Sequence, residues 1–273
     1  MTVLNHPGFC PESHRFAALT VDLDGESVWH RAGQGAPAPL HRSQGRFGPS
    51  EGVWNLVALF EEFDLPATFF VPGVVAEAYP DLVADLADRG YEIGAHGYTH
   101  VHPTRLSEEE ERQQLIDTVS VLHGITGQQV LGYRAPGYQV SPHTFNILAS
   151  EGLMYDSSLM DSERPYVGEE GVVEIPASWS LDDWALYGES TAEELATLMP
   201  ASQVAAALQY EFEARSTARA LFVVVIHPQL SGRVSRVRAW REFLQEARKD
   251  AEMPWTTLGD LARRVREGCG CMS

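Results

Sequence analysis

The sequence has few cysteines and no long apolar run. Only three cysteines occur among the 273 residues, Cys10, Cys269 and Cys271, and their spacing suggests neither a disulfide framework nor a zinc finger. We expect free thiols in short mobile chain ends. No apolar stretch approaches the roughly 20 residues that a membrane span needs, which excludes an integral membrane protein of the helical class.

Basic residues are also scarce. Twenty Lys and Arg face 38 Asp and Glu, for a formal net charge of −18, so the chain lacks the basic footprint typical of proteins that bind nucleic acid or anionic membranes. The first thirty residues lack the basic start, apolar core and small-residue cleavage site of a signal peptide. We therefore expect a cytoplasmic protein with no nucleic-acid or membrane partner.

The composition is that of a folded globular protein, with 44% hydrophobic and 10% aromatic residues. The length admits one or two domains, and α/β barrels reach about 250 residues as a single domain. No internal repeat, low-complexity tract or Pro/Ser-rich linker divides the chain. These features leave the number of domains open between one and two.

Short apolar runs alternate with helical patterns along the chain. The runs predicted as strands are 16–21, 67–71, 91–95, 130–133, 172–175 and 221–226, and the predicted helices are 52–63, 80–89, 107–126, 141–152, 191–215 and 238–249. This alternation predicts parallel strands joined by helical crossovers. Ser107 and Glu110 form a capping-box pattern, and the Gly- and Pro-rich stretch 30–49 is predicted to be one long loop.

Chemically competent side chains follow four of the predicted strands. Asp22 and Asp24 end the first, and the later three end in His96, Arg134 and His227. Because the carboxyl ends of parallel strands meet on one face, these side chains are expected to converge there. Asp22 and Asp24 are two residues apart, so an extended chain directs both to the same side.

A metal site is predicted from Asp24, His96 and His100. The two histidines are four apart, a spacing that places both on one side of a helical turn. With Asp24 they form a two-histidine, one-carboxylate set suited to zinc or another divalent first-row ion, and three ligands leave a position open for water. Such a site can activate a bound water and polarise a carbonyl, as metal-assisted hydrolysis requires.

Hydrolysis also needs a base for the water and an acid for the leaving group. Asp22 is placed to be the base, and Arg134 to hold its carboxylate ionised and oriented. His227 is the candidate acid for a leaving amine.

At these residues the chain resembles the polysaccharide deacetylase family of metal-dependent amide hydrolases, whose fold is a distorted or incomplete (β/α) TIM-like barrel. The resemblance is carried by ordered motifs at 20–26, 92–100, 133–138, 155–159, 179–184 and 226–228, with a matching structural strand at 67–73. Because these motifs run from Thr20 to Pro228 without a break, we predict a single catalytic domain over residues 1–273. Leu23 separates two aspartates that are adjacent in typical members. This departure resembles the subgroup that contains peptidoglycan deacetylase-like, allantoinase-like and cyclic imide hydrolase-like members, several of which are tetramers.

The resemblance implies a role for each matching residue. It makes Asp22 the base, Arg134 its orienting partner and His227 the acid. It assigns Asp24, His96 and His100 to a divalent metal, foremost zinc, with cobalt, manganese or iron as alternatives. The carboxylate that supports His227 is Asp183 by the family pattern, with Asp182 an equally placed rival.

The expected function is hydrolysis of a non-peptide carbon–nitrogen bond in an N-acetylated sugar or a small cyclic amide or imide, by a homo-oligomer. Tyr138, Trp179, Trp184 and Tyr187 are candidates to line the substrate pocket. Two alternatives are a non-haem Fe(II) oxygenase and a catalytically inactive carbohydrate-binding barrel. The additional Asp22 and His227 argue against the first, and the filled catalytic positions argue against the second.

Overall fold

The computed structural model describes residues 15–29, 38–187 and 199–270. Cys10 and Cys271, and the parts of the predicted loop and helix at 30–37 and 191–198, lie outside these residues. Within the described part of the chain, no helix combines the length and the hydropathy needed to cross a bilayer.

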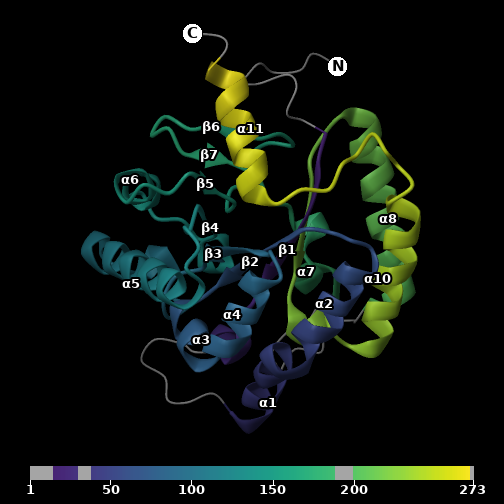
Figure 1. Ribbon diagram of the computed structural model, residues 1–273, viewed down its shortest axis with the longest axis horizontal. Helices are drawn as coiled ribbons and strands as arrows, with labels where there is room; N and C mark the ends of the chain where they lie inside the picture. The colour runs from purple at the N-terminus through teal and green to yellow at the C-terminus, as the bar shows by residue number, and fades with distance from the viewer. Residues whose placement is uncertain (1–14, 30–37, 188–198, 271–273) are drawn as a thin grey trace.

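One curled sheet of eight strands forms the centre of the molecule (Figure 1). Its spatial order is β6-β7-β5-β4-β3-β2-β1-β8, and every neighbouring pair is parallel except β6 with β7. The strands are β1 (Ala17–Asp22), β2 (Ala67–Val71), β3 (Glu92–Ala95), β4 (Gly132–Tyr133), β5 (Tyr155–Asp156), β6 (Tyr166–Val167), β7 (Val173–Glu174) and β8 (Phe222–Ile226). Because β6 and β8 end the row, the barrel is incomplete, and the predicted fold is confirmed.

Helices surround this sheet, most of them on its outer side (Figure 1). They are α1 (Pro39–Phe47), α2 (Val53–Glu62), α3 (Gly73–Ala78), α4 (Pro80–Asp88), α5 (Glu108–Thr126), α6 (Thr144–Ser150), α7 (Asp183–Tyr187), α8 (Ala201–Ala218), α9 (Pro228–Ser231), α10 (Val234–Ala247) and α11 (Leu258–Gly270). The capping box predicted at the start of α5 is present, with Ser107 and Glu110 bonding each other reciprocally.

The prediction of one long loop over 30–49 is wrong in its second half. Residues Pro39–Phe47 form α1, which runs into a π-helical turn at Gly48–Gly52. Proline is well tolerated in the first turn of a helix, where its missing N–H leaves no hydrogen bond unmade. Gly45 is needed for close packing, because an added Cβ would lie 2.7 Å from the Gly25 carbonyl oxygen. The Gly and Pro residues of these two segments therefore lie in helical structure and not in a loop.

The two faces of each strand contribute to different parts of the core. In β1, Leu19 and Val21 pack among the outer helices, whereas Ala18 packs inside the curled sheet with residues such as Phe70 and Tyr155. Side chains alternate along a strand, so Asp22 follows Ala18 on the inner side. The apolar interior of the barrel therefore leads to the polar groups at the strand ends.

Helix α11, which the sequence reading did not identify, packs against this interior. Its apolar residues recur at helical spacing and join the inner cluster: Leu258, Leu261, Ala262 and Val265. The Leu258 N–H donates to the Thr68 hydroxyl at 3.0 Å, and the Gly259 N–H donates to the Glu92 carboxylate at 2.9 Å. Glu92 begins β3, so α11 lies at the amino ends of the strands, opposite the residues predicted to be catalytic.

Candidate active site

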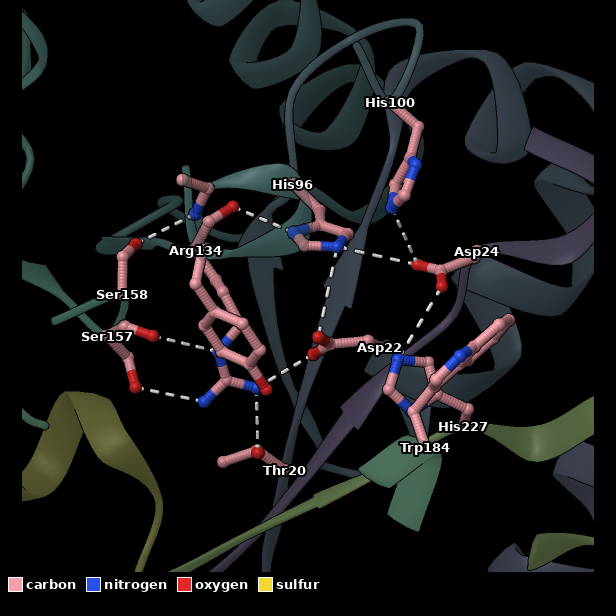
Figure 2. A network of polar contacts seen from close by, with 12 residues as sticks. Thr20, Asp22, Asp24, His96, His100, Arg134, Ser157, Ser158, Trp184 and His227 are labelled. Atoms are coloured by element: carbon pink, nitrogen blue, oxygen red, sulfur yellow. Dashed lines mark hydrogen bonds and ion pairs between the residues drawn. The ribbon is translucent and has the colours of Figure 1, made fainter. Parts of the chain in front are cut away.

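The carboxyl ends of β1, β3, β4 and β8 bring the predicted residues together (Figure 2). Asp22 is the last residue of β1, and His96, Arg134 and His227 each follow directly on their strands. These four residues and Asp24 are buried. Their exposed fractions are 3% for Asp22, 1% for Asp24, 2% for His96, 0% for Arg134 and 7% for His227. Residues up to about 200 positions apart in sequence thus share one small polar centre.

Asp24, His96 and His100 form a compact donor set. The Asp24 Oδ1 atom lies 3.4 Å from Nε2 of both histidines. The His96 Nδ1 lies 2.7 Å from the Arg134 carbonyl oxygen. A proton on Nδ1 donates to that carbonyl and leaves the Nε2 lone pair free, which is the tautomer of a metal-ligating histidine.

The Asp24 Oδ1 atom is buried and lacks a hydrogen-bond partner among the described residues. An unpaired buried carboxylate oxygen is costly, and a cation satisfies it. Burial raises the pKa of the Asp24 carboxyl, but the neighbouring His100, His96 and His227 lower it by more, so that it lies far below its ordinary value. An ionised carboxylate facing two imidazole nitrogens fits a divalent ion of the zinc type.

The His96–His100 segment is a loop, so the helical turn predicted from its spacing is wrong. Gly97 has a φ of +66° and His100 a φ of +58°, both in the left-handed region. The Gln114 side-chain oxygen accepts the N–H groups of Tyr98 and Thr99 at 3.3 and 3.2 Å. These features reverse the chain and place the His96 and His100 rings 5.0 Å apart.

Arg134 binds Asp22 from beneath the site. Its Nη1 donates to Asp22 Oδ1 at 2.7 Å and to the Thr20 hydroxyl at 2.8 Å. Its Nε and Nη2 donate to the carbonyl and the hydroxyl of Ser157 at 3.0 and 2.9 Å. The guanidinium also lies 4.4 Å from the Phe70 ring centroid. Arg134 is thus held rigidly, and a charge-assisted bond orients the Asp22 carboxylate. The sequence reading did not single out Thr20 and Ser157 for this role, although both lie in the quoted motifs.

Asp183, and not Asp182, bonds the ring of His227. The His227 Nδ1 lies 2.7 Å from Asp183 Oδ1, and the His227 backbone N–H donates to Asp183 Oδ2 at 2.9 Å. Asp182 lies 3.9 Å from the same Nδ1 and instead accepts hydrogen bonds from the Tyr138 hydroxyl and the Trp184 backbone N–H. Burial lowers the pKa of His227, but Asp183, Asp182 and Asp24 raise it by more, to well above its ordinary value.

A cavity of about 700 Å³ opens over these residues. Tyr138, Trp179 and Trp184 line it, as their sequence positions suggested. Trp179 is 52% exposed and packs edge-to-face on Tyr138, and the Trp184 ring lies 5.2 Å from that of His227. Tyr187 is fully buried and lies outside the lining. The sequence reading missed the other lining residues, which are Val28, Val101, His102, Arg105 and Gly137.

Comparison with known proteins identifies the family. The polysaccharide deacetylase family model matches residues 47–155. The crystal structure of a Mycobacterium smegmatis protein assigned to the polysaccharide deacetylases superposes with a TM-score of 0.85 and 33% identity, over 96% of this chain and 94% of that one. The chain belongs to the polysaccharide deacetylase family. It is therefore a hydrolase of the class that acts on carbon–nitrogen bonds other than peptide bonds, as predicted.

Two further known proteins are similar to this chain. A peptidoglycan deacetylase of Helicobacter pylori is 28% identical over 90% of this chain and 94% of its own length. The allantoinase PuuE has a TM-score of 0.83 at 22% identity, covering 97% of this chain and 95% of that one, which shows a shared fold alone.

Proposed function

We propose that the protein is a metal-dependent deacetylase that hydrolyses the amide of an N-acetylated amino sugar. One observation carries this proposal: the unpaired Asp24 oxygen faces two histidine nitrogens, within a polar centre that also holds a buried Asp–Arg pair and a His–Asp pair. The similarity to a peptidoglycan deacetylase along nearly the whole chain supports an acetylated sugar. Zinc is the ion we propose, with cobalt, manganese and iron as alternatives.

Asp24, His96 and His100 would hold the ion. When bound, a divalent cation lowers the pKa of water towards about 7 and polarises a carbonyl oxygen. Asp22 takes a proton from the attacking water, while Arg134 fixes the direction of the carboxylate. Asp22 Oδ2 lies 3.8 Å from the His96 Nε2, which places the base beside the donor set.

His227 supplies the proton that the leaving nitrogen needs. Its Nε2 faces the site, 3.7 Å from Asp24 Oδ2, while Nδ1 is bonded to Asp183. The raised pKa keeps the ring protonated near neutral pH, which is the state required of a general acid. The carbonyl carbon gains the oxygen of water, the C–N bond breaks, and the products are acetate and a free amine.

An activity screen with added Zn²⁺, Co²⁺ or Mn²⁺ tests the proposal. The panel contains N-acetylated amino sugars and their oligomers, with allantoin, hydantoins and cyclic imides for comparison. We expect acetate release from the sugars, loss of activity with a chelator, and unchanged rates without oxygen. Activity confined to the cyclic compounds would reassign the substrate, and a requirement for oxygen would favour the iron oxygenase.

Asp22→Asn tests the role of the base. We expect turnover to fall by about 10²–10⁴-fold, the usual contribution of a positioned general base, while metal analysis still finds one ion per chain. Asp85→Asn, which removes a carboxylate that pairs with Arg89 on the exposed side of α4, is the matched control. Substantial turnover by Asp22→Asn would contradict its role.

A further inference from the structure

One wall of the cavity contains a positively charged side chain that has no role in the proposed catalytic mechanism. The segment after His100 contributes Val101, His102 and Arg105 to the lining, and Arg105 ends the short turn Pro103–Arg105. The Arg105 backbone N–H donates to the His102 carbonyl at 2.9 Å, which ties the two residues into one turn. Arg105 is thus connected to the metal-binding loop through only a few residues.

The acidic groups of the cavity are already engaged elsewhere. Arg134 binds Asp22, the two histidines face Asp24, and the Tyr138 hydroxyl and the Trp184 N–H donate to Asp182. Among the described residues, no carboxylate lies within ion-pair distance of the Arg105 guanidinium. Its charge is therefore available to a molecule in the cavity.

Arg134 is unavailable for that purpose. It is fully buried, it does not line the cavity, and its Nε, Nη1 and Nη2 donate to Asp22, Thr20 and Ser157. Among the described residues, Arg105 is thus the arginine that lines the cavity, in a chain of net charge −18 that repels anions as a whole. A guanidinium fork matches the geometry of a carboxylate or a phosphate.

We propose that Arg105 forms an anion-binding subsite, so that the preferred substrate is an amide that also carries a carboxylate or a phosphate. His102 lies beside Arg105 and packs over Gly137, where an added Cβ would come within 2.8 Å of its Nε2. The His102 ring also lines the cavity and gives the same wall a second polar group. This inference rests on the proposed function, because it names the substrate class of the same site.

Matched substrate pairs test it with the metal-loaded enzyme. N-Acetylmuramic acid is N-acetylglucosamine with an added carboxylate, and N-acetylglucosamine 6-phosphate is the same acetamido sugar with an added phosphate. A third pair compares hydantoin-5-acetic acid with hydantoin. We expect the charged member of one pair to be preferred at least about tenfold in kcat/KM, and the preference to fall as salt is added. The pair that responds distinguishes a carboxylate from a phosphate.

Arg105→Gln should remove most of that preference, and Arg105→Lys should restore part of it, since the charge returns without the fork. Arg238→Gln, which removes an equally positive side chain from the exposed face of α10, should leave the ratio as it is in the wild type. Equal melting temperatures exclude misfolding as the cause.

Two results are distinguishable failures. Hydrolysis of the neutral members at the same kcat/KM as the charged ones, or an unchanged ratio in Arg105→Gln, overturns the subsite and leaves the proposed function intact. Hydrolysis of no member by the metal-loaded enzyme overturns the proposed function itself.

Discussion

Asp183 fixes His227 at two points. It accepts both the ring Nδ1–H and the backbone N–H of His227, and the Ser231 hydroxyl donates to the same carboxylate. The ring therefore cannot turn without breaking a buried charge-assisted bond. At this scale a single carboxylate sets both the orientation and the protonation of the proposed acid, which makes Asp183 a positioning residue.

Asp183→Asn should lower kcat by about 10–100-fold, the usual effect of removing such a supporting partner. The loss of a negative charge lowers the pKa of His227, so the fall in activity on the alkaline side should move to lower pH. A pH profile of kcat measures this. Asp182→Asn provides the comparison, because Asp182 lies 3.9 Å from Nδ1 and should produce a smaller shift. An unmoved alkaline limb in Asp183→Asn would show that His227 is not the acid.

At the scale of elements, the His96–His100 loop depends on left-handed backbone. Gly97 has a φ of +66°, and an added Cβ would lie 3.0 Å from the Pro136 ring. Gly127, which caps α5, has a φ of +68° and no neighbour within 4 Å of an added Cβ. The two glycines therefore share a backbone conformation and differ in their surroundings.

Gly97→Ala and Gly127→Ala should each lower the free energy of unfolding by about 1–2 kcal/mol, because alanine is strained at positive φ. Only Gly97→Ala should also weaken metal binding, by about tenfold or more, since it displaces the histidine loop against Pro136. Metal titration of both variants separates the effects. Equal metal affinities would mean that the loop geometry does not control the site.

Neighbouring strands β5 and β7 contain a buried carboxyl pair. Asp156 and Glu174 are opposite one another in register, and both side chains are buried. Burial raises the pKa of Asp156 to about 6, although bonds from Glu174 and Ser158 and the charge of Arg134 oppose the rise. Burial and Asp156 raise the pKa of Glu174 well above its ordinary value.

Because both folded pKa values are raised, the folded state holds protons that the unfolded state releases above pH 4. Stability from this pair is complete below that pH and is lost as the pH rises through the two raised pKa values, of which that of Asp156 is about 6. Glu174→Gln should reduce the difference in the free energy of unfolding between pH 5 and pH 8 by about 1–3 kcal/mol. Urea unfolding at both pH values measures it, with exposed Glu170→Gln as the control. If this difference in the free energy of unfolding is the same in Glu174→Gln as in the wild type, Glu174 does not hold an extra proton in the folded state.

How far the sequence predicted the structure depended on the residues concerned. Strands such as β1 and β8 are continuous apolar runs, so their ends, and the polar side chains beyond them, were readable from the pattern. The placement of His100 was not, because it depends on left-handed backbone that spacing does not encode. Choosing Asp183 over Asp182 required the tertiary approach of β8. The apolar spacing of α11 was present in the sequence and was overlooked.

At the scale of the whole molecule, the proposed metal contributes to stability. A ligand that binds only the folded chain stabilises it by about 2.7 kcal/mol at a hundredfold excess over its Kd. Adding Zn²⁺ to metal-free protein should therefore raise Tm by several degrees, and a chelator should reverse the change. Asp24→Asn should abolish the response, because it replaces the unpaired carboxylate oxygen of the donor set. A rise in Tm that persists in this variant would place the ion elsewhere.

Two expectations about the whole molecule stay predictions. They are the homo-oligomer, a tetramer by family resemblance, and the single domain over residues 1–273.

The position of β1 in the sheet has a consequence for synthesis on the ribosome. β1 lies between β2 and β8, and its Val21 is paired with Ile226, about 200 residues later in the chain. A nascent chain that has already made β1 to β7 carries the edge of β1 unpaired, a state prone to association with other chains. Translation must also reach His227 before Asp22 and Asp24 face a proton donor. The partly made chain is thus expected to be prone to association and to lack the proposed acid.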